Sequence, residues 1–571
     1  MLSFHITLQA LLWTAANALD YGVGRGTAKP SCRCFPGESC WPSSDIWNAF
    51  NTSLDGKLIS TVPLASPCHE DSVTGYNAEL CVALQDNWFN PVTHISSASS
   101  VMAPFFGGQS CNPFLNRSTP CTIGNDAVYA VNATSAEDYQ QTLAFAKAHN
   151  IRLVIRNTGH DYNGKSTGAG SLALWTTHIK TQQLKQHSAS HYTGPAFRFE
   201  YADSYGFVVV AGNEPTVGLV GGYTQGGGHG PLASRFGLAA DQLLEWEVVL
   251  PASQVVVVAA PGSQYEDLYW ALCGGGGGTF AAVLSVTIKA HPAMSLSTAS
   301  LEFVIADNAS DSTADSFFAL IGSFTRQVPA INDAGAVAIW FITAKSFTLQ
   351  TLFGPNLTTS HLDQLLQPVL SDADRFGMQY TYDTTFYSSF LKGFSAQPVV
   401  NVSQLNIGGR LIPRALIESG SSVITAVIRN ITSSGALFSG VSFNVSQYLA
   451  DSIAANPYWR DSVMDAVVAN YWSYTDSPDN IASINAITRN LLPQMEDLTP
   501  KGGAYLNEAD FQQIGWQQVF YGAHYEKLSQ IKSKYDPDDV FYALGAVGSE
   551  RWIRQPDGRL CRANETDGII V

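Results

Sequence analysis

The stretch RNTGHDYNGKSTGAG, residues 156–170, separates three kinds of protein. Gly159–Ser166 match the phosphate-binding pattern G-x-x-x-x-G-K-[ST], and Gly164–Gly168 match the G-x-S-x-G turn of serine hydrolases. Both patterns require a helix directly after the motif. Here Gly168 and Gly170 follow, each disfavouring helix by about 1 kcal/mol relative to alanine. The residues after them are strand-like, so both interpretations are disfavoured.

The third interpretation concerns His160, which lies among glycines as a covalent flavin anchor would. That chemistry needs an unprotonated imidazole nitrogen, and neighbouring glycines let the backbone approach a bulky cofactor and its pyrophosphate. A lone histidine beside glycine is more often a turn residue. However, the flavin hypothesis predicts further glycine-rich loops, and GGYTQGGGHG (221–230) and CGGGGGTF (273–280) supply them. The three loops together favour a flavin site.

The residues before the quoted stretch predict a strand–helix–strand unit. AVYAV (127–131) and RLVIRN (152–157) are strand-like. Thr134 and Glu137 form a T-x-x-E capping box for the helix between them. The unit delivers Gly159 to the end of a strand, where α/β folds tend to bind ligands. The apolar face of the helix consists of Ala136, Tyr139, Leu143 and Ala146.

The rest of the chain predicts two further regions. Up to residue 292 we expect a strand over 207–212, a hairpin of 245–250 with 254–260, a helix over 265–272 and a strand over 283–290. Residues 293–500 mix amphipathic helices with short strands and lack comparable glycine clusters, as a second α+β domain would. In the tail, a helix within 516–537 places Val519, Tyr525, Leu528 and Ile531 roughly on one side.

Composition limits the possible partners. The net charge of −16 and the pI near 5.1 give no general attraction to nucleic acids or anionic membranes. No later apolar run is long enough to span a bilayer. The N-terminus carries a short apolar stretch and the small-x-small pattern Ala16-Asn17-Ala18, which predicts a signal peptide.

Cysteines and glycosylation sequons agree with a secretory route. Seven of the nine cysteines lie in the first 121 residues, which predicts a disulfide-stapled N-terminal segment. The odd count leaves a thiol unpaired, for which Cys273 is our candidate. We expect a product that is secreted or retained in the secretory lumen, the vacuole included. The N-x-[ST] sequons begin at Asn51, Asn116, Asn132, Asn308, Asn356, Asn401, Asn430, Asn444 and Asn564.

Several stretches in the same order resemble one family. IRNTGHDYNGKSTG, PTVGLVGGYTQGGGHG, EDLYWALCGGGGGTF and the tail YLNEAD with WQQVFYGAHYEKLSQIKSKYDP resemble FAD-linked oxidases of the vanillyl-alcohol oxidase superfamily, in the berberine-bridge-enzyme-like branch. CRCFPGESCWPSSDIWNAFN and the ending VGSERW resemble its fungal secreted members, including isoamyl alcohol oxidases. The resemblance implies an α+β fold with a two-part FAD-binding domain and an inserted α+β substrate domain.

The resemblance also implies domain limits and site residues. We expect a signal peptide (1–18), a cysteine-rich segment (19–120), an FAD-binding domain (121–292), a substrate domain (293–500) and a C-terminal segment completing the FAD site (501–571). His160 matches the flavin-linked histidine, and Tyr505 is our candidate for proton handling. The other implied cofactor-binding residues are Gly159, Asp161, Asn163, Gly164, Ser166, Gly222, Tyr223, Gly226, Gly227, Gly228, Gly277, Gly278, Thr279 and Asn507.

Two positions depart from the family pattern. Many relatives carry cysteine in C-P-T-V-G and attach the flavin a second time, whereas this chain has Glu214. We therefore predict attachment through His160 only. Phe236 stands where plant relatives often have a tyrosine, and phenylalanine cannot act as a base. His229 is interpreted as a loop residue, and no metal site is predicted.

The expected activity is oxidation of an alcohol or hydroxylated, polyketide-like metabolite by flavin, with dioxygen reduced to peroxide. The alternatives are a flavin-dependent dehydrogenase or cyclase with little oxygen use, a carbohydrate oxidase, and a binder that has lost redox activity. We expect a monomer. The substrate cannot be deduced, because residues 293–500 carry no recognisable motif.

Overall fold

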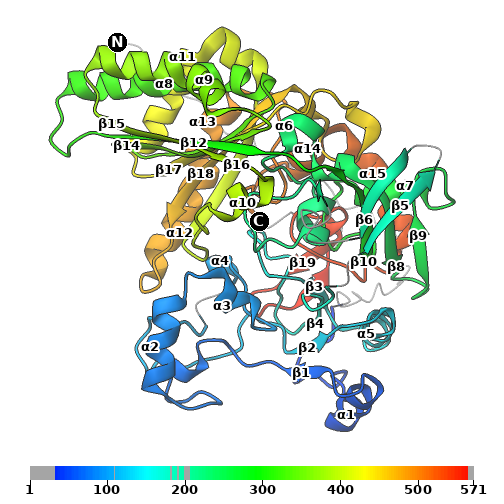
Figure 1. The fold of residues 1–571 in the computed structure, drawn as a ribbon. Coiled ribbons are helices and arrows are strands. Elements are labelled where there is room, and N and C mark those ends of the chain that lie inside the picture. The colour runs from blue at the N-terminus through cyan, green and yellow to red at the C-terminus, as the bar shows by residue number, and fades with distance from the viewer. Residues whose placement is uncertain (1–31, 108–109, 181–182, 190–191, 199–205, 564–571) are drawn as a thin grey trace, which may run out of the picture.

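The computed structural model describes residues 32–107, 110–180, 183–189, 192–198 and 206–563. The expected signal peptide (1–18) and the sequon at Asn564 lie outside these residues. Within the described part, mixed strands and helices form several packed layers (Figure 1). The α+β class predicted from the sequence is confirmed.

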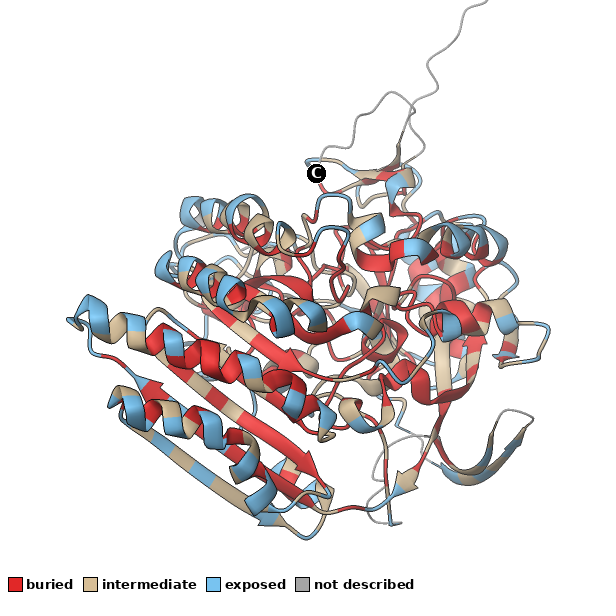
Figure 2. Ribbon diagram, turned by 90° about the horizontal axis from the view of Figure 1, so that it is seen from above, coloured by how far each residue is buried: buried red, intermediate tan, exposed pale blue. Residues whose placement is uncertain are grey.

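A seven-stranded antiparallel sheet forms one region of the described chain. Helices α8 (Asp311–Asp333), α9 (Thr359–Phe376) and α11 (Arg414–Ser433) lie side by side on one of its faces (Figures 1 and 2). In spatial order the strands are β15 (Tyr380–Tyr387), β12 (Leu296–Val304), β14 (Ser346–Pro355), β13 (Val337–Ile342), β17 (Leu437–Ser442), β18 (Ser462–Tyr471) and β16 (Leu405–Pro413).

The predicted strand–helix–strand unit forms a small sheet in the order β1 (Leu58–Ser60), β2 (Tyr129–Asn132), β4 (Leu172–Trp175), β3 (Leu153–Arg156). Strands β2, β4 and β3 are parallel, and helix α5 (Ala136–Ala148) connects β2 to β3. Its face of Tyr139, Leu143 and Ala146 is buried, as predicted. This topology brings residues 157–160 to the end of β3.

The capping box of α5 lies one residue further along than predicted. Ser135, not Thr134, is the N-cap, and its hydroxyl accepts from the amide of Asp138 at 3.3 Å. The Asp138 carboxylate accepts in turn from the amides of Ser135 (3.0 Å) and Thr134 (2.8 Å) and pairs with Lys57. The shorter aspartate side chain satisfies these donors, so Glu137 is not part of the box.

A five-stranded sheet lies beside the glycine-rich loops. The predicted hairpin of β8 with β9, the helix α7 (Glu266–Leu272) and the strand β10 are present. The strand predicted over 207–212 is much shorter: β7 ends at Val208 and pairs with β11 (His291–Pro292). In spatial order the strands are β5 (Gln183–Ala189), β6 (Tyr192–Arg198), β10 (Ala282–Lys289), β8 (Leu243–Val249) and β9 (Val256–Ala259).

The C-terminal helix is broken where we expected it to be continuous. Helix α14 (Trp516–Tyr521) ends at Gly522, a 3₁₀ turn follows, and α15 (Tyr525–Tyr535) continues. Gly522 has a φ of +56°, a conformation that favours glycine and interrupts the helix. Leu528 and Ile531 are buried, as their spacing predicts.

Disulfides hold the N-terminal segment, as predicted. The pairs are Cys34–Cys40, Cys68–Cys81 and Cys111–Cys121, and Cys32 bonds to Cys561 near the other end of the chain. Cys273 is buried and free, which confirms its prediction as the unpaired thiol. The helices of this segment are α1 (Ser44–Ser53), α2 (Ala78–Asn87), α3 (Pro91–Ile95) and α4 (Pro104–Gly107).

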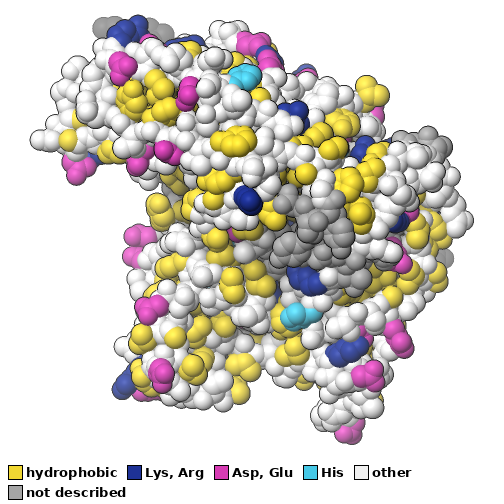
Figure 3. Space-filling model, in the orientation of Figure 1, with side chains coloured by type: hydrophobic (Ala, Val, Ile, Leu, Met, Phe, Trp, Pro, Cys, Tyr) yellow, Lys and Arg dark blue, Asp and Glu magenta, His cyan; other side chains and the backbone are white. Residues whose placement is uncertain are grey.

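On the face shown in Figure 3, acidic side chains are spread around the periphery and do not gather in one patch. In the part of the chain that the structure describes, no helix combines the length and apolar character needed to cross a bilayer.

The remaining short elements include α6 (Ala233–Phe236), α10 (Phe390–Ser395), α12 (Ser477–Ala486), α13 (Leu492–Glu496), β19 (Trp552–Arg554) and β20 (Leu560–Arg562).

Candidate functional site

A cavity of about 350 Å³ lies where the glycine-rich loops meet the end of β3 and the C-terminal tail. Its volume is in the range of small-molecule sites. Of the predicted cofactor-site residues, those that line it are Gly159, His160, Asp161, Ser166, Gly222, Tyr223, Gly277, Gly278, Tyr505 and Asn507. Those that belong to the same loops without lining the cavity are Asn163, Gly164, Gly226, Gly227, Gly228 and Thr279.

The first loop is held by its own polar side chains. The Asp161 carboxylate accepts from the amides of Asn163 (2.9 Å) and Ser166 (2.7 Å). The side-chain amide of Asn163 donates to the carbonyl of Leu506 at 2.6 Å, which ties the loop to the tail. Gly159 has a φ of +87°, and a Cβ there would lie 2.9 Å from the Arg156 guanidinium. Glycine is therefore required directly before His160.

The other two glycine loops are in backbone contact. A Cβ on Gly277 would lie 2.7 Å from the Cα of Gly222. A Cβ on Gly226 would lie 2.4 Å from Nδ2 of Asn507, which donates to the carbonyl of Gly222 at 2.8 Å. These glycines therefore let two loops and the tail close together along one wall of the cavity.

His160 is a neutral imidazole at the cavity wall. Burial lowers its pKa to about 4, and the nearby His94 contributes in the same direction. Its Nε2 lies 2.6 Å from Oγ1 of Thr216. A neutral ring keeps one nitrogen lone pair, which is what a nucleophile needs.

The polar groups around the cavity fit a flavin nucleotide. Side-chain oxygens of Asn157, Asn213 and Gln225, all cavity residues, are buried without a hydrogen-bond partner in the described part of the chain. Buried polar atoms are normally satisfied, so these are available to hydroxyl or N–H groups of a ligand. Lys165 adds a cation to the wall, and burial lowers its pKa to about 8. An anionic phosphate beside it would favour its charged form.

A polar cluster lies at the end of the cavity near Tyr505. Nε2 of His229 is 3.1 Å from Oε1 of Glu508, and an oxygen of Asp465 lies within 4.8 Å of both groups. Asp465 is fully buried, and neither carboxylate oxygen has a partner among the described residues. Burial, with the charge of Glu508, raises the pKa of Asp465 well above its usual range. These surroundings therefore favour the protonated form of this carboxyl group.

Tyr505 is the predicted proton-handling residue, and its surroundings do not favour a phenolate. Burial and the neighbouring Glu508 raise the pKa of Tyr505. The side-chain amide of Asn507 donates to its oxygen at 2.8 Å. The ring stands edge-on to His229, 5.2 Å between centroids. A protonated tyrosine beside a histidine–glutamate pair can relay a proton but is a weak base alone.

Sequence inspection missed Asp465 and Glu508 and interpreted His229 as a loop residue. Glu508 directly follows the YLN motif, and Asp465 interrupts the apolar run SVMDAVVANY (462–471). A charged residue inside a strand-like apolar run was the available indication. In β18, Asp465 alternates with Met464 and Ala466, which belong to the core under the helices, so it faces the opposite side of the sheet.

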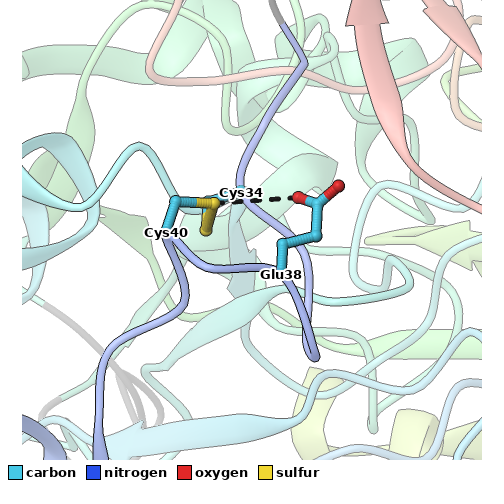
Figure 4. A group of neighbouring side chains, drawn as sticks. All are labelled: Cys34, Glu38 and Cys40. Carbon is cyan, nitrogen blue, oxygen red and sulfur yellow. Dashed lines mark hydrogen bonds between the residues drawn. A yellow bond between two sulfur atoms is a disulfide. The ribbon is translucent and has the colours of Figure 1, made fainter.

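Within the described ranges, two groups of side chains lie as close together as metal ligands do. His229, Asp465 and Glu508 form one, and Cys34, Glu38 and Cys40 form the other. The sulfurs of Cys34 and Cys40 are bonded to each other, and Cys40 contacts Glu38 at 3.7 Å (Figure 4). A disulfide supplies no thiolate, so the second group is structural.

Comparison with known proteins defines the class. A family model described as FAD binding domain matches residues 127–259, and one described as berberine and berberine like matches residues 504–547. FAD-linked oxidoreductase sor8 of Hypocrea jecorina is 45% identical over 547 residues, covering 94% of each chain. The chain therefore belongs to the FAD-linked oxidoreductases of the vanillyl-alcohol-oxidase type, with a berberine-bridge-enzyme-like C-terminal segment.

Two further relatives sharpen the class. The crystal structure of the VAO-type flavoprotein MtVAO615 from Myceliophthora thermophila superposes with a TM-score of 0.88 at 37% identity, covering 93% of this chain and 100% of that one. The bifunctional decalin synthase of Penicillium decumbens is 37% identical, covering 93% of this chain and 95% of its own. The predicted family and its FAD-binding fold are confirmed.

Proposed function

We propose that this protein is an FAD-dependent oxidase that converts an alcohol, or a hydroxylated secondary metabolite, to the carbonyl compound. The observation that carries the proposal is the single cavity wall shared by a neutral His160, the glycine loops and the Tyr505 cluster. FAD, when bound, accepts a hydride at N5 from the substrate carbon and passes the electrons to dioxygen, giving hydrogen peroxide.

The chain's own residues hold and orient the cofactor. The loop 159–166 and Lys165 suit the pyrophosphate, because backbone amides and a cation stabilise its charge. Gly222 and Gly277 permit close approach of the flat ring system. His160 provides the covalent link, and Glu214 leaves no second cysteine there.

The polar cluster moves the proton. The substrate hydroxyl gives its proton to the phenolic oxygen of Tyr505 as the phenol's own proton passes to the His229–Glu508 pair, whose imidazole stands edge-on to the Tyr505 ring. Asn507 orients the phenol through its hydrogen bond, and the buried Asp465 lies beside the His229–Glu508 pair. The buried aromatic wall of Trp459 and Tyr505, 5.2 Å between centroids, keeps water away.

A second candidate is a flavin-dependent cyclase or dehydrogenase that uses little oxygen. The decalin synthase relative favours it, since that protein's name describes ring formation. The same cofactor site and proton cluster would serve either reaction. Peroxide formed per substrate consumed separates the two.

Passage through the secretory pathway is part of the proposal. It is supported by four disulfides among the described residues and by the sequons along the chain. Signal-peptide cleavage after Ala18, glycosylation and a monomeric state stay predictions, which intact mass and light scattering of the secreted protein would measure.

The test is a screen of primary, secondary and aromatic alcohols, hydroxylated polyketides and oligosaccharides against purified yellow protein. We expect one class to bleach the flavin anaerobically and to yield peroxide in air at about one molecule per turnover. Bleaching without peroxide would favour the dehydrogenase or cyclase. Failure of every hydroxyl compound to bleach the flavin would contradict the oxidase.

A further inference from the structure

Glu214 occupies the position where many relatives carry a flavin-linked cysteine, and the structure connects it to His160. Oγ1 of Thr216 donates to Oε1 of Glu214 at 2.7 Å, and the same Oγ1 lies 2.6 Å from Nε2 of His160. The three side chains form a continuous carboxylate–hydroxyl–imidazole chain. Glu214 and His160 both line the cavity.

The carboxylate of Glu214 is fixed by the backbone on two sides. Its Oε1 also accepts from the amide of Thr216 at 3.2 Å, and its Oε2 accepts from the amide of Val400 at 3.2 Å. Val400 belongs to a distant segment, 186 residues along the chain. Both carboxylate oxygens thus serve as acceptors, and an ionised carboxylate can only accept.

The direction of these hydrogen bonds determines which ring nitrogen of His160 keeps an unprotonated lone pair. Thr216 has one hydroxyl proton, and the ionised Glu214 takes that hydrogen bond. Nε2 of His160 must therefore carry the ring proton and donate to Thr216. Nδ1 keeps its lone pair, and among the described residues no group is hydrogen-bonded to it.

We propose that Glu214, acting through Thr216, is the positioning residue for flavin attachment: it holds His160 with Nδ1 as the nucleophile and takes up the Nε2 proton as the bond forms. This inference rests on the proposed covalent FAD. Carboxylates behind histidines commonly fix the tautomer and raise the basicity of the other nitrogen. The side chain that replaces the second attachment point thus assists the first.

The attachment step balances as follows. Nδ1 bonds to the carbon of the flavin's 8-methyl group, one C–H bond of that group breaks with loss of a proton, and its electron pair reduces the ring. The Nε2 proton of His160, acidified by the new bond, passes to Thr216 as the Thr216 proton passes to Glu214. Dioxygen removes the two electrons from the ring and leaves as hydrogen peroxide with the C–H proton and the proton that Glu214 then gives up, which restores the carboxylate.

The test compares E214Q, T216V and T216S with the wild type. Each protein is purified with its bound flavin, incubated in air and sampled over time. Acid precipitation and in-gel fluorescence give the covalent fraction, and peptide mapping locates it at His160. A glutamine still accepts from the amide and hydroxyl of Thr216 through its amide oxygen, but it cannot take up the proton that leaves Nε2. We expect attachment about 10- to 100-fold slower in E214Q and T216V, and near-normal attachment in T216S.

Glu508→Gln is the matched control, because Glu508 lines the same cavity but pairs with His229. We expect it to leave attachment unchanged, whatever it does to turnover. Wild-type attachment rates in E214Q or T216V would overturn the relay and leave the oxidase intact. If E214Q fails to fold, the T216V and T216S pair decides. A wild-type protein that releases all its flavin in acid overturns the covalent link and the relay together, while substrate bleaching still tests the oxidase.

Discussion

The seven-stranded sheet and the cavity region differ in the partners that their buried side chains have. Under the helices of the sheet, Phe317, Phe324 and Phe347 are completely buried. Phe317 and Phe347 each contact the ring of Phe303, and Phe324 stands edge-on to Phe347. Around the cavity, Asn157 and Gln225 carry buried polar atoms without partners among the described residues. Apolar side chains that pack against one another need no ligand, whereas buried polar atoms without hydrogen-bond partners indicate one. The unpaired polar atoms at the cavity support the proposed flavin site, while Asn332 of α8 shows that the helical layer also keeps a buried oxygen without a partner among the described residues.

Asp465 is the point where the two regions meet. It lies on β18 of the regular sheet, yet its carboxyl group faces the Tyr505 cluster without a hydrogen-bond partner among the described residues. A buried charge-bearing residue in an otherwise apolar strand costs stability, so it indicates function over packing. The sheet thus supplies one functional group to a site built mostly by loops.

The largest expected effect is on turnover. Tyr505→Phe removes the phenolic oxygen while keeping the ring contacts with His229 and Trp459. We expect flavin reduction by substrate to slow about 10²- to 10⁴-fold, because proton transfer is lost. Anaerobic stopped-flow absorbance measures this rate. Tyr471→Phe, at an exposed position at the end of β18, is the control. A slowing below tenfold in Tyr505→Phe would reject the proposed role.

A substitution in the core of the seven-stranded sheet should change the stability of the protein and leave the cofactor site unchanged. Phe324→Ala empties a fully buried position between Trp340 and Phe347, which costs about 3–5 kcal/mol of unfolding free energy. Denaturant unfolding would show the loss, and the visible spectrum of the folded fraction should be unchanged. Val304→Ala, more than half exposed on β12, should cost much less. A changed flavin spectrum would mean that the two regions are not independent.

Crowding one glycine should weaken the cofactor site specifically. Gly226→Ala places a methyl group 2.4 Å from Nδ2 of Asn507 and displaces its bond to Gly222. In a His160→Ala background, where flavin is held without a covalent link, we expect about tenfold weaker FAD binding in fluorescence titration. Gly420→Ala in α11, with no neighbouring atom closer than 3.6 Å, is the control. Equal affinities would show that Asn507 does not shape the site.

The smallest effect expected is a pH-dependent gain in stability. The raised pKa of Asp465 means that the folded state holds its proton longer than the unfolded chain does. Stability from this group is therefore complete below the unfolded pKa and is lost as pH rises toward the folded pKa. Asp465→Asn removes this loss, so its melting temperature should exceed that of wild type by about 1–3 °C at pH 8, and match it near pH 3. The exposed Asp461→Asn is the control, and an advantage that grows toward low pH would contradict the assignment.

Local patterns predicted the local parts of the site well. The strand–helix–strand unit, the glycine loops and the cavity position of His160 follow from contiguous motifs. The fine positions were less predictable: the capping box shifted by one residue, and Gly522 broke a helix whose apolar spacing continued across it. A spacing pattern identifies a face, whereas hydrogen bonds and φ values fix where an element ends.

Such local patterns could not predict the polar cluster near Tyr505. His229 and Glu508 are 279 residues apart in sequence, and Glu214 meets Val400 only in the folded chain. No local spacing encodes these contacts, because loops from distant parts of the chain must first be packed together. Of the cluster residues, only Asp465 could have been noticed in the sequence, as a carboxylate within an apolar strand.

The bond between Cys32 and Cys561 joins residues 529 positions apart, so nearly the whole described chain is closed into a covalent ring. Proteolytic cleavage of any surface loop inside that ring opens a circle and releases nothing. The clipped molecule would keep its mass, apart from one added water, until a reductant separated the pieces. A chain closed in this way keeps both pieces together after a first cleavage.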